Sequence, residues 1–218
     1  MAQGKVGILG SGTVGQKLGA GFRKSGYEVM IGTRNPDKLG DYLKGEGQGV
    51  RVGSFADTAA FGEILALATK WDGGATESAI QQAEKRNFSG KVLIDVTNPL
   101  VFEAPNQPPK LAMGFPGSAG ALIQSWLPEA KVVKAFNIVS SHYMANPNLQ
   151  EGKPDMFVAG NDEKARQQVM GIASDWGWTV ASLGGIDQAY LLEALAMLWI
   201  RYGALNNHWT HAFKLLKK

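Results

Sequence analysis

A glycine-rich turn near the N-terminus constrains the fold of this chain more than any other feature. Residues 10–15 read GSGTVG, with the spacing G-x-G-x-x-G, and they follow a short apolar run, Lys5 to Leu9. That run is typical of a buried parallel strand, and a helix is predicted from about Val14 to Lys24. In this setting Gly10 permits a tight turn, and Gly15 lets the helix pack closely on the strand.

A turn between a strand and a helix is also a phosphate-binding element. The first N–H groups of the helix have no partner within it, so they can donate to phosphate oxygens. The alternative is a glycine-rich turn without a ligand, which this position disfavours. The residues that we assign to the pyrophosphate of a dinucleotide are Gly10, Ser11, Gly12, Thr13 and Val14.

Predicted strands and helices then alternate along the chain. Further strands are expected at 27–32, 50–54, 63–68, 91–96 and 132–136. Helices are expected at 36–44, 56–61 and 76–86, and a loop at 111–120 leads into a helix that ends at Trp126. This alternation predicts an α/β fold with a Rossmann-type, doubly wound parallel sheet.

The last third of the chain is predicted to be a small appendage. We expect residues 1–150 to form a dinucleotide-binding domain, and 151–218 to pack on it and close a second cleft. Strands are expected at 155–159 and 178–183, and helices at 162–175 and 187–216. The last helix is apolar on most faces, so we expect it to be buried against the sheet or another subunit.

The end of the second strand favours a phosphorylated cofactor. An NAD enzyme usually has an acidic residue there, which binds the ribose 2′-hydroxyl. This chain has no carboxylate there before Asp37, and an arginine fork can pair with a 2′-phosphate. The alternative is that the cations are solvated surface groups. The residues assigned to the 2′-phosphate of NADP(H) are Thr33, Arg34, Asn35 and Lys38.

The nicotinamide of such a cofactor lies across the carboxyl ends of the strands. The amides, hydroxyl and indole that follow strands four, five and six can orient and enclose it. The alternatives are that the tryptophan packs at the rim and that the asparagines cap turns. The residues assigned to this part of the site are Thr69, Lys70, Trp71, Asn98 and Asn137.

No acid–base pair or metal site is evident. The chain has no cysteine and three histidines; His208 and His211 fall one turn apart on the expected last helix, where packing is favoured over a metal pair. Glu193 can shape a pocket, be a satisfied buried carboxylate or lie on a helix face.

The lack of an evident acid–base pair bears on the hydride acceptor. Reduction of a carbonyl needs a proton donor, whereas hydride exchange between two rings mainly needs their alignment. Another redox cofactor therefore fits as the acceptor.

The charge distribution and the N-terminal sequence indicate neither a nucleic-acid nor a membrane partner. The net charge of +3 is spread along the chain, so no nucleic-acid partner is predicted. The sequence does not begin with a charged and then apolar leader, and the longest apolar stretch is too short for a bilayer. We therefore expect a cytoplasmic protein without a membrane partner.

Several stretches together resemble the F420-dependent NADP oxidoreductases. They are GILGSGTVG at 7–15, GTRN at 32–35 with Lys38, Trp71, DVTNPL at 95–100, KVVKAFN at 131–137, and LEAL at 192–195 leading to LWI at 198–200. The resemblance implies hydride transfer between NADPH and the deazaflavin coenzyme F420 or a flavin in its place, in a cleft beside the C-terminal part. It also implies a homodimer or higher homo-oligomer, here through the C-terminal helices. The cytoplasmic domain of STEAP metalloreductases is similar.

One departure leaves the hydride acceptor open. Archaeal members usually carry Pro-Trp-x-His after strand four, whereas this chain has Lys70 and Gly73 in place of the proline and histidine. A second hypothesis is a non-catalytic NADP(H)-responsive sensor, which would also lack catalytic side chains. A third is a β-hydroxyacid-type dehydrogenase, but its catalytic lysine after a longer helical domain is not identifiable.

Overall fold

The computed structural model describes residues 3–104 and 107–216. Its strands are β1 (Lys5–Leu9), β2 (Glu28–Gly32), β3 (Arg51–Gly53), β4 (Ile64–Leu67), β5 (Val92–Asp95), β6 (Leu100–Val101), β7 (Lys110–Leu111), β8 (Lys131–Lys134), β9 (Asp155–Gly160) and β10 (Thr179–Ser182). Its α-helices are α1 (Thr13–Lys24), α2 (Gly40–Lys44), α3 (Phe55–Phe61), α4 (Ala75–Gln82), α5 (Ala119–Trp126), α6 (Glu163–Asp175) and α7 (Ala189–Asn206).

Eight strands form one sheet in the order β10-β9-β8-β5-β4-β1-β2-β3. The six strands from β8 to β3 are parallel, which confirms the predicted α/β, Rossmann-type sheet. β9 runs antiparallel to β8, and β10 is parallel to β9, so the sheet is mixed at this edge. The connection from β8 to β9 contains only a short 3₁₀ turn, Ser141–Tyr143. Without a crossover helix the chain returns antiparallel.

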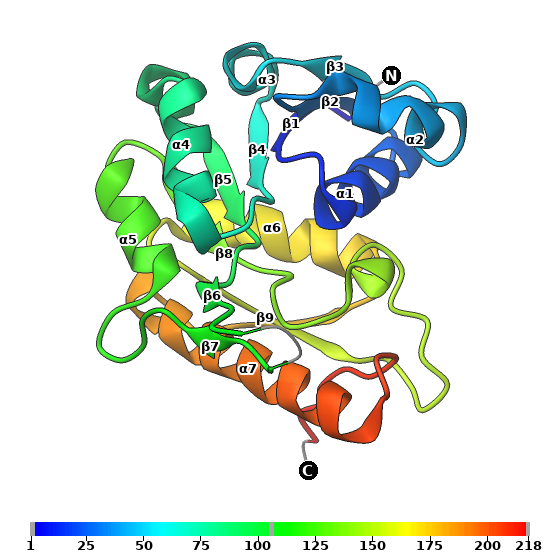
Figure 1. Ribbon diagram of the computed structural model, residues 1–218, viewed down its shortest axis with the longest axis vertical. Coiled ribbons are helices and arrows are strands. Elements are labelled where there is room, and N and C mark those ends of the chain that lie inside the picture. The colour runs from blue at the N-terminus through cyan, green and yellow to red at the C-terminus, as the bar shows by residue number, and fades with distance from the viewer. Residues whose placement is uncertain (1–2, 105–106, 217–218) are drawn as a thin grey trace.

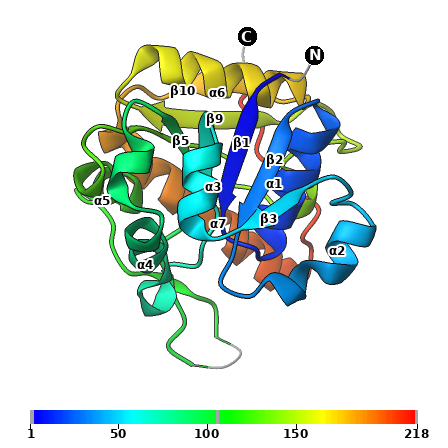
Figure 2. The same ribbon diagram turned by 90° about the horizontal axis from the view of Figure 1, so that it is seen from above.

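Helices cover both faces of the sheet (Figures 1 and 2). α1 and α6 pack on one face, in a core that includes Phe22 and Trp178. α3, α4 and α5 pack on the other face, around residues such as Phe88 and Ile123. The strands between them are buried on both faces, which explains why β4 is a continuous apolar run and β5 is an apolar run that ends in Asp95.

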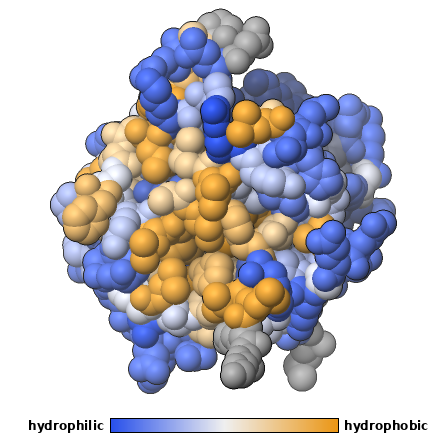
Figure 3. Space-filling view, turned by 90° about the horizontal axis from the view of Figure 1, so that it is seen from below, coloured by the Kyte–Doolittle hydropathy of each residue, from blue (hydrophilic) through white to orange (hydrophobic). Residues whose placement is uncertain are grey.

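α7 lies at the end of the molecule toward which the parallel strands point (Figure 1). Its inner side packs in the core that includes β9 through Leu192 and Ala196, and against α5 near Ala189. Its outer side belongs to the face in Figure 3, where apolar side chains gather in one continuous area. The short β6–β7 hairpin, which sequence patterns did not indicate, lies beside α7.

The prediction of one helix over 187–216 is wrong. α7 ends at Asn206 because Asn207 adopts a left-handed conformation (φ 46°) and the N–H of His208 donates to the carbonyl of Gly203. The following segment returns to β9, where the N–H of Asp155 donates to the Phe213 carbonyl. His208 and His211 therefore do not share a helix.

Two other predicted helices also differ. The helix expected at 76–86 ends at Gln82, and a 3₁₀ turn at Lys85–Phe88 follows after Glu84 adopts a positive φ of 61°. The helix expected at 36–44 is a 3₁₀ turn, Pro36–Leu39, followed by the single turn of α2. The N-terminal proline fits the first turn, because it needs no donor there.

Candidate functional site

The turn between β1 and α1 has the glycine geometry that its sequence predicts. Gly10 has φ +126°, and a Cβ there would lie 2.5 Å from the Ala68 carbonyl oxygen. A Cβ at Gly15 would lie 1.9 Å from the carbonyl oxygen of Gly10. At Gly12, by contrast, a Cβ would meet nothing within 4 Å, so this glycine leaves open space in front of the helix. Gly10 and Gly15 are required by the fold, whereas Gly12 is not.

The N-terminus of α1 is available to an anion. Gly12 is the N-cap and has no side chain to accept from the first N–H groups, and the first turn has no acidic residue. The turn is fixed from both sides: Gln16 Nε2 donates to the carbonyl of Ser11 (2.9 Å), and Ser11 Oγ lies 2.7 Å from Thr33 Oγ1. Free N–H groups and the helix dipole make this a favourable place for phosphate oxygens.

The end of β2 lies directly beside this turn. Thr33 is buried, and its hydroxyl also accepts from the N–H of Asn35 (3.1 Å). Arg34, Asn35 and Lys38 are exposed, and neither cation forms an ion pair with another described residue. The Ser11–Thr33 contact therefore joins the two groups of predicted cofactor-binding residues. The unpaired cations Arg34 and Lys38 lie next to this contact.

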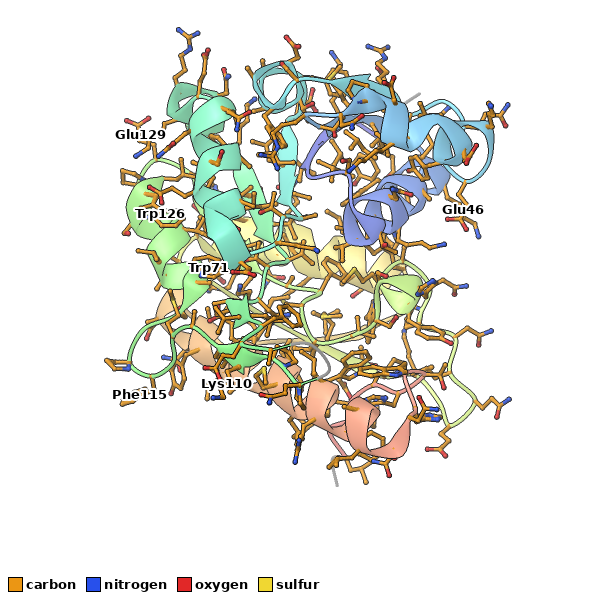
Figure 4. The ribbon with its side chains drawn as sticks, viewed as in Figure 1. Glu46, Trp71, Lys110, Phe115, Trp126 and Glu129 are labelled. Carbon is orange, nitrogen blue, oxygen red and sulfur yellow. The ribbon has the colours of Figure 1, made fainter. Side chains whose placement is uncertain are left out.

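The end of β4 contributes an aromatic wall. Trp71 stacks on Trp126 of α5, with ring centroids 6.0 Å apart and planes within 9° (Figure 4). The two indoles border a hollow of about 300 Å³ that Val101 and Ala112 also line. Thr69 bonds Thr76 through their hydroxyls (3.0 Å), while Lys70 is exposed. The Trp71 side chain thus packs against another aromatic ring and is partly buried.

The ends of β5 and β8 are joined by an asparagine pair. Asn98 Nδ2 donates to the Asn137 carbonyl (2.9 Å), and Asn137 Nδ2 donates to Asn98 Oδ1 (2.8 Å) and to the Leu192 carbonyl of α7 (3.1 Å). Asn137 is buried, yet its Oδ1 has no hydrogen-bond partner among the described residues. A buried acceptor of this kind needs a donor. A ligand amide at the strand ends can supply it.

Sequence reasoning missed a buried ion triad beneath this pair. Lys134 at the end of β8 lies 2.7 Å from Asp95 Oδ2 and 3.0 Å from Glu193 Oε1, and all three side chains are inaccessible or nearly so. Lys134 Nζ also donates to the Thr97 carbonyl (2.6 Å). The signal was present as single charges that interrupt the apolar runs VVKAF (132–136), VLIDV (92–96) and LLEAL (191–195).

Hydrogen bonds from neighbouring groups support both carboxylates of the triad, although Asp95 Oδ2 has only its ion contact with Lys134. Asp95 Oδ1 accepts from the N–H and hydroxyl of Thr97, and Glu193 accepts from the N–H groups of Ala119 and Gly120 at the start of α5. Burial by itself lowers the pKa of Lys134, but the charges of Asp95 and Glu193 outweigh it and leave that pKa raised. Lys134 is therefore a fixed cation, and Glu193 is a satisfied buried carboxylate.

No group of three or more His, Cys, Asp or Glu side chains among the described residues is placed to bind a metal. His211 stacks on Trp199 (4.7 Å) and its Nε2 lies 3.1 Å from the Trp199 carbonyl, so it packs against α7. A hollow of about 890 Å³ lies between residues 148–154 and the C-terminal segment, and its lining includes none of the predicted cofactor residues.

The sequence and structure are both similar to known redox proteins. Residues 5–99 match the family described as NADP oxidoreductase coenzyme F420-dependent. A solved structure of a putative F420-dependent NADP reductase from Arthrobacter sp. FB24 is 34% identical and superposes with a TM-score of 0.91, over 98% of this chain and 100% of that one. The chain belongs to the F420-dependent NADP oxidoreductase family. It is an NADP-dependent oxidoreductase of that type, as its sequence predicted.

Two curated relatives extend this comparison. The F420-dependent NADP reductase of Methanocaldococcus jannaschii is 28% identical over 207 residues, which are 90% of this chain and 91% of that protein. The metalloreductase STEAP3 of Rattus norvegicus is 26% identical over 193 residues, but these are only 36% of its length. The chain thus spans about a third of the STEAP protein. Within residues 3–104 and 107–216, no helix is long and apolar enough to cross a membrane.

Proposed function

We propose that this oxidoreductase transfers hydride between NADPH and a deazaflavin (coenzyme F420) or a flavin-like acceptor. The observation that carries the proposal is the chemistry at the strand ends. Amides, hydroxyls and an indole line them, while Asp95 and Lys134 are engaged in a buried triad. Such a surface can orient two rings, and among the described residues no acid–base pair is placed there to protonate a carbonyl. Bound NADPH would supply the hydride itself.

The assignment of cofactor residues is part of the same proposal. The free N–H groups of α1 support pyrophosphate binding by residues 10–14, and the open space at Gly12 allows close approach. The unpaired cations support binding of the 2′-phosphate by Thr33, Arg34, Asn35 and Lys38. The unpartnered Oδ1 of Asn137 supports binding of the nicotinamide amide there, beside Asn98 and with Thr69, Lys70 and Trp71 at the other strand end. These features fit NADP(H).

Cofactor selectivity tests the 2′-phosphate assignment. Arg34→Ala should weaken NADPH binding by about 10- to 150-fold, because a hydrogen-bonded charge contact contributes about 1.5–3 kcal/mol. NADH lacks the phosphate, so its affinity should stay the same. Titration calorimetry measures both, and Lys85→Ala removes a matched exposed cation from a distant 3₁₀ turn. Equal losses for the two cofactors would contradict the assignment.

Hydride transfer is tested by mixing the purified protein with NADPH and F420, with flavin and quinone acceptors in parallel reactions. Oxidation of NADPH that depends on F420 or flavin supports the proposal. Tight NADPH binding without turnover on any acceptor would refute it. That result would favour the alternative, an NADP(H)-responsive binding protein, because the lack of a poised acid or base suits that role equally well.

We also propose the setting in which this activity occurs. Residues 151–218 would close the cleft of the second substrate above the 1–150 domain, since α7 reaches the asparagine pair through the Leu192 carbonyl. The protein would act in the cytoplasm as a homo-oligomer formed through its C-terminal helices. Small redox cofactors would be its other partners.

A further inference from the structure

The buried triad at the strand ends is not electrically balanced. It contains two carboxylates, Asp95 and Glu193, and one ammonium, Lys134. The N–H and hydroxyl of Thr97 donate to Asp95, and two backbone N–H groups at the start of α5 donate to Glu193. These donors match ionised carboxylates, which only accept hydrogen bonds. The triad therefore carries one negative charge in excess.

The surroundings of the triad compensate this charge only in part. The start of α5, which donates to Glu193, carries about half a positive charge from its helix dipole. Among the residues that the structure describes, Lys134 is the one buried cation. The other lysines and arginines are at least partly exposed, so water and salt screen them. A buried negative charge therefore remains at this end of the sheet.

This charge lies directly beneath the asparagine pair. The N–H of Thr97 donates to Asp95 Oδ1 (2.9 Å), and Asn98 is the next residue. Because successive Cα atoms are about 3.8 Å apart, the Cα of Asn98 lies within about 9 Å of that carboxylate. Asn137 donates to the Leu192 carbonyl, and the glutamate of the triad follows Leu192. The unpartnered Oδ1 of Asn137, to which we assign the nicotinamide amide, is therefore close to the triad.

The two redox forms of the nicotinamide differ in charge at this place. The ring of NADPH is neutral and the ring of NADP⁺ is a cation, because the acceptor takes one hydrogen together with its electron pair. A negative charge fixed in a poorly solvated interior favours a cation nearby, since little water is present to screen the attraction. The triad can therefore distinguish the two forms without touching the ring.

We propose, on the basis of the cofactor site proposed above, that the excess charge of the triad stabilises the oxidised nicotinamide over the reduced one. This favours hydride transfer from NADPH to the acceptor, so the direction of the reaction is biased by buried residues. A unit charge about 10 Å away, at an effective dielectric constant of about 20 to 40, changes such an equilibrium roughly 5- to 15-fold. By linkage, the same factor raises the affinity for NADP⁺ relative to NADPH.

Titration calorimetry with NADP⁺ and NADPH tests this bias through binding alone. Glu193→Gln removes the excess charge at nearly constant shape, so NADP⁺ affinity should fall roughly 5- to 15-fold more than NADPH affinity. Asp95→Asn removes it from the other side of Lys134 and should shift the ratio in the same direction, which keeps the test available if one variant does not fold. Glu193→Asp keeps the charge and should keep the wild-type ratio. Glu129→Gln, an exposed carboxylate beyond the C-terminal end of α5 (Figure 4), should change neither affinity.

The ratio of the two affinities separates a charge effect from a structural one. Equal losses for NADP⁺ and NADPH in Glu193→Gln and Asp95→Asn would overturn the bias, because a purely structural role of the triad affects both forms alike. A shift in Glu193→Asp as large as that in Glu193→Gln would overturn it too. In both cases the wild type still binds the two forms, so the proposed cofactor site stands. A wild type that binds neither form would refute the proposed function, and the bias with it.

Discussion

Among single residues, Lys134 shows how a fully buried charge is stabilised in this protein. A buried ammonium is tolerated only when it is paired and hydrogen-bonded. Asp95, Glu193 and the Thr97 carbonyl together meet that requirement. Thr97, which accepts from Lys134, is followed by Asn98. Glu193 is preceded by Leu192, whose carbonyl accepts from Asn137. The triad therefore connects the core to both asparagines of the pair.

Removing the buried cation should be costly. Lys134→Met would leave two buried carboxylates without their counter-ion, so we expect the free energy of unfolding to fall by about 3–5 kcal/mol. Urea titration measures this. Lys131→Met is the control on the same strand, because Lys131 is partly exposed and its contact with Asp162 (3.7 Å) is a surface pair worth at most about 1 kcal/mol. Equal losses in both variants would contradict the role of the triad.

The same residue predicts a pH dependence. The pKa of Lys134 is raised in the folded state above its ordinary value of 10.5, so its protonated form stabilises the fold. That contribution is complete below about pH 10.5 and is lost as the pH rises through the folded pKa. The stability difference between wild type and Lys134→Met should therefore shrink above pH 10.5. A constant difference from pH 8 to 12 would contradict the shift.

Among the elements, the β1–α1 turn separates residues needed for folding from a residue that only a ligand would require. Its first and third glycines are fixed by contacts inside the protein. Its second glycine faces open space. Spacing alone could identify the motif, but only the backbone positions distinguish these roles.

Two alanine substitutions should therefore behave differently. Gly15→Ala would force a Cβ against the Gly10 carbonyl oxygen, so we expect a large loss of thermal stability. Gly12→Ala should cost at most about 1 kcal/mol, because Gly12 has an ordinary φ of −71° and no neighbour. It should nevertheless reduce NADPH affinity strongly by blocking the phosphate. Scanning calorimetry and NADPH fluorescence titration measure the two effects; unchanged affinity in Gly12→Ala would contradict phosphate binding there.

At the scale of the whole molecule, the C-terminal third completes the sheet. β9 pairs with β8, α6 packs on β8, β9 and β10, and the segment after α7 returns to Asp155 through Phe213 and Leu215. Without residues 151–218, β8 would become an exposed edge, and Lys134 would lose Glu193. The proposed boundary at residue 150 thus falls between β8 and β9 of one eight-stranded sheet, and we expect this sheet to unfold cooperatively.

Truncation tests this cooperativity. A fragment of residues 1–150 should lack a cooperative thermal transition and should not bind NADPH, whereas the full chain should unfold in one step by circular dichroism and tryptophan fluorescence. Two separate transitions in the full chain, or a stable fragment that binds NADPH, would show instead that the first 150 residues fold independently.

The sequence by itself determined the local features: the glycine turn, the apolar strands, the alternation that gives a parallel sheet, and the missing acid after β2. These depend on residues close together in the chain, where spacing and backbone preference are decisive. It did not predict that β9 and β10 reverse, that α7 ends at Asn206, or that Lys134 meets Asp95 and Glu193. Those outcomes depend on contacts between distant segments, such as Trp199 with His211. Only the tertiary structure brings these residues together, because burial and pairing are properties of the folded surroundings and not of the spacing along the chain.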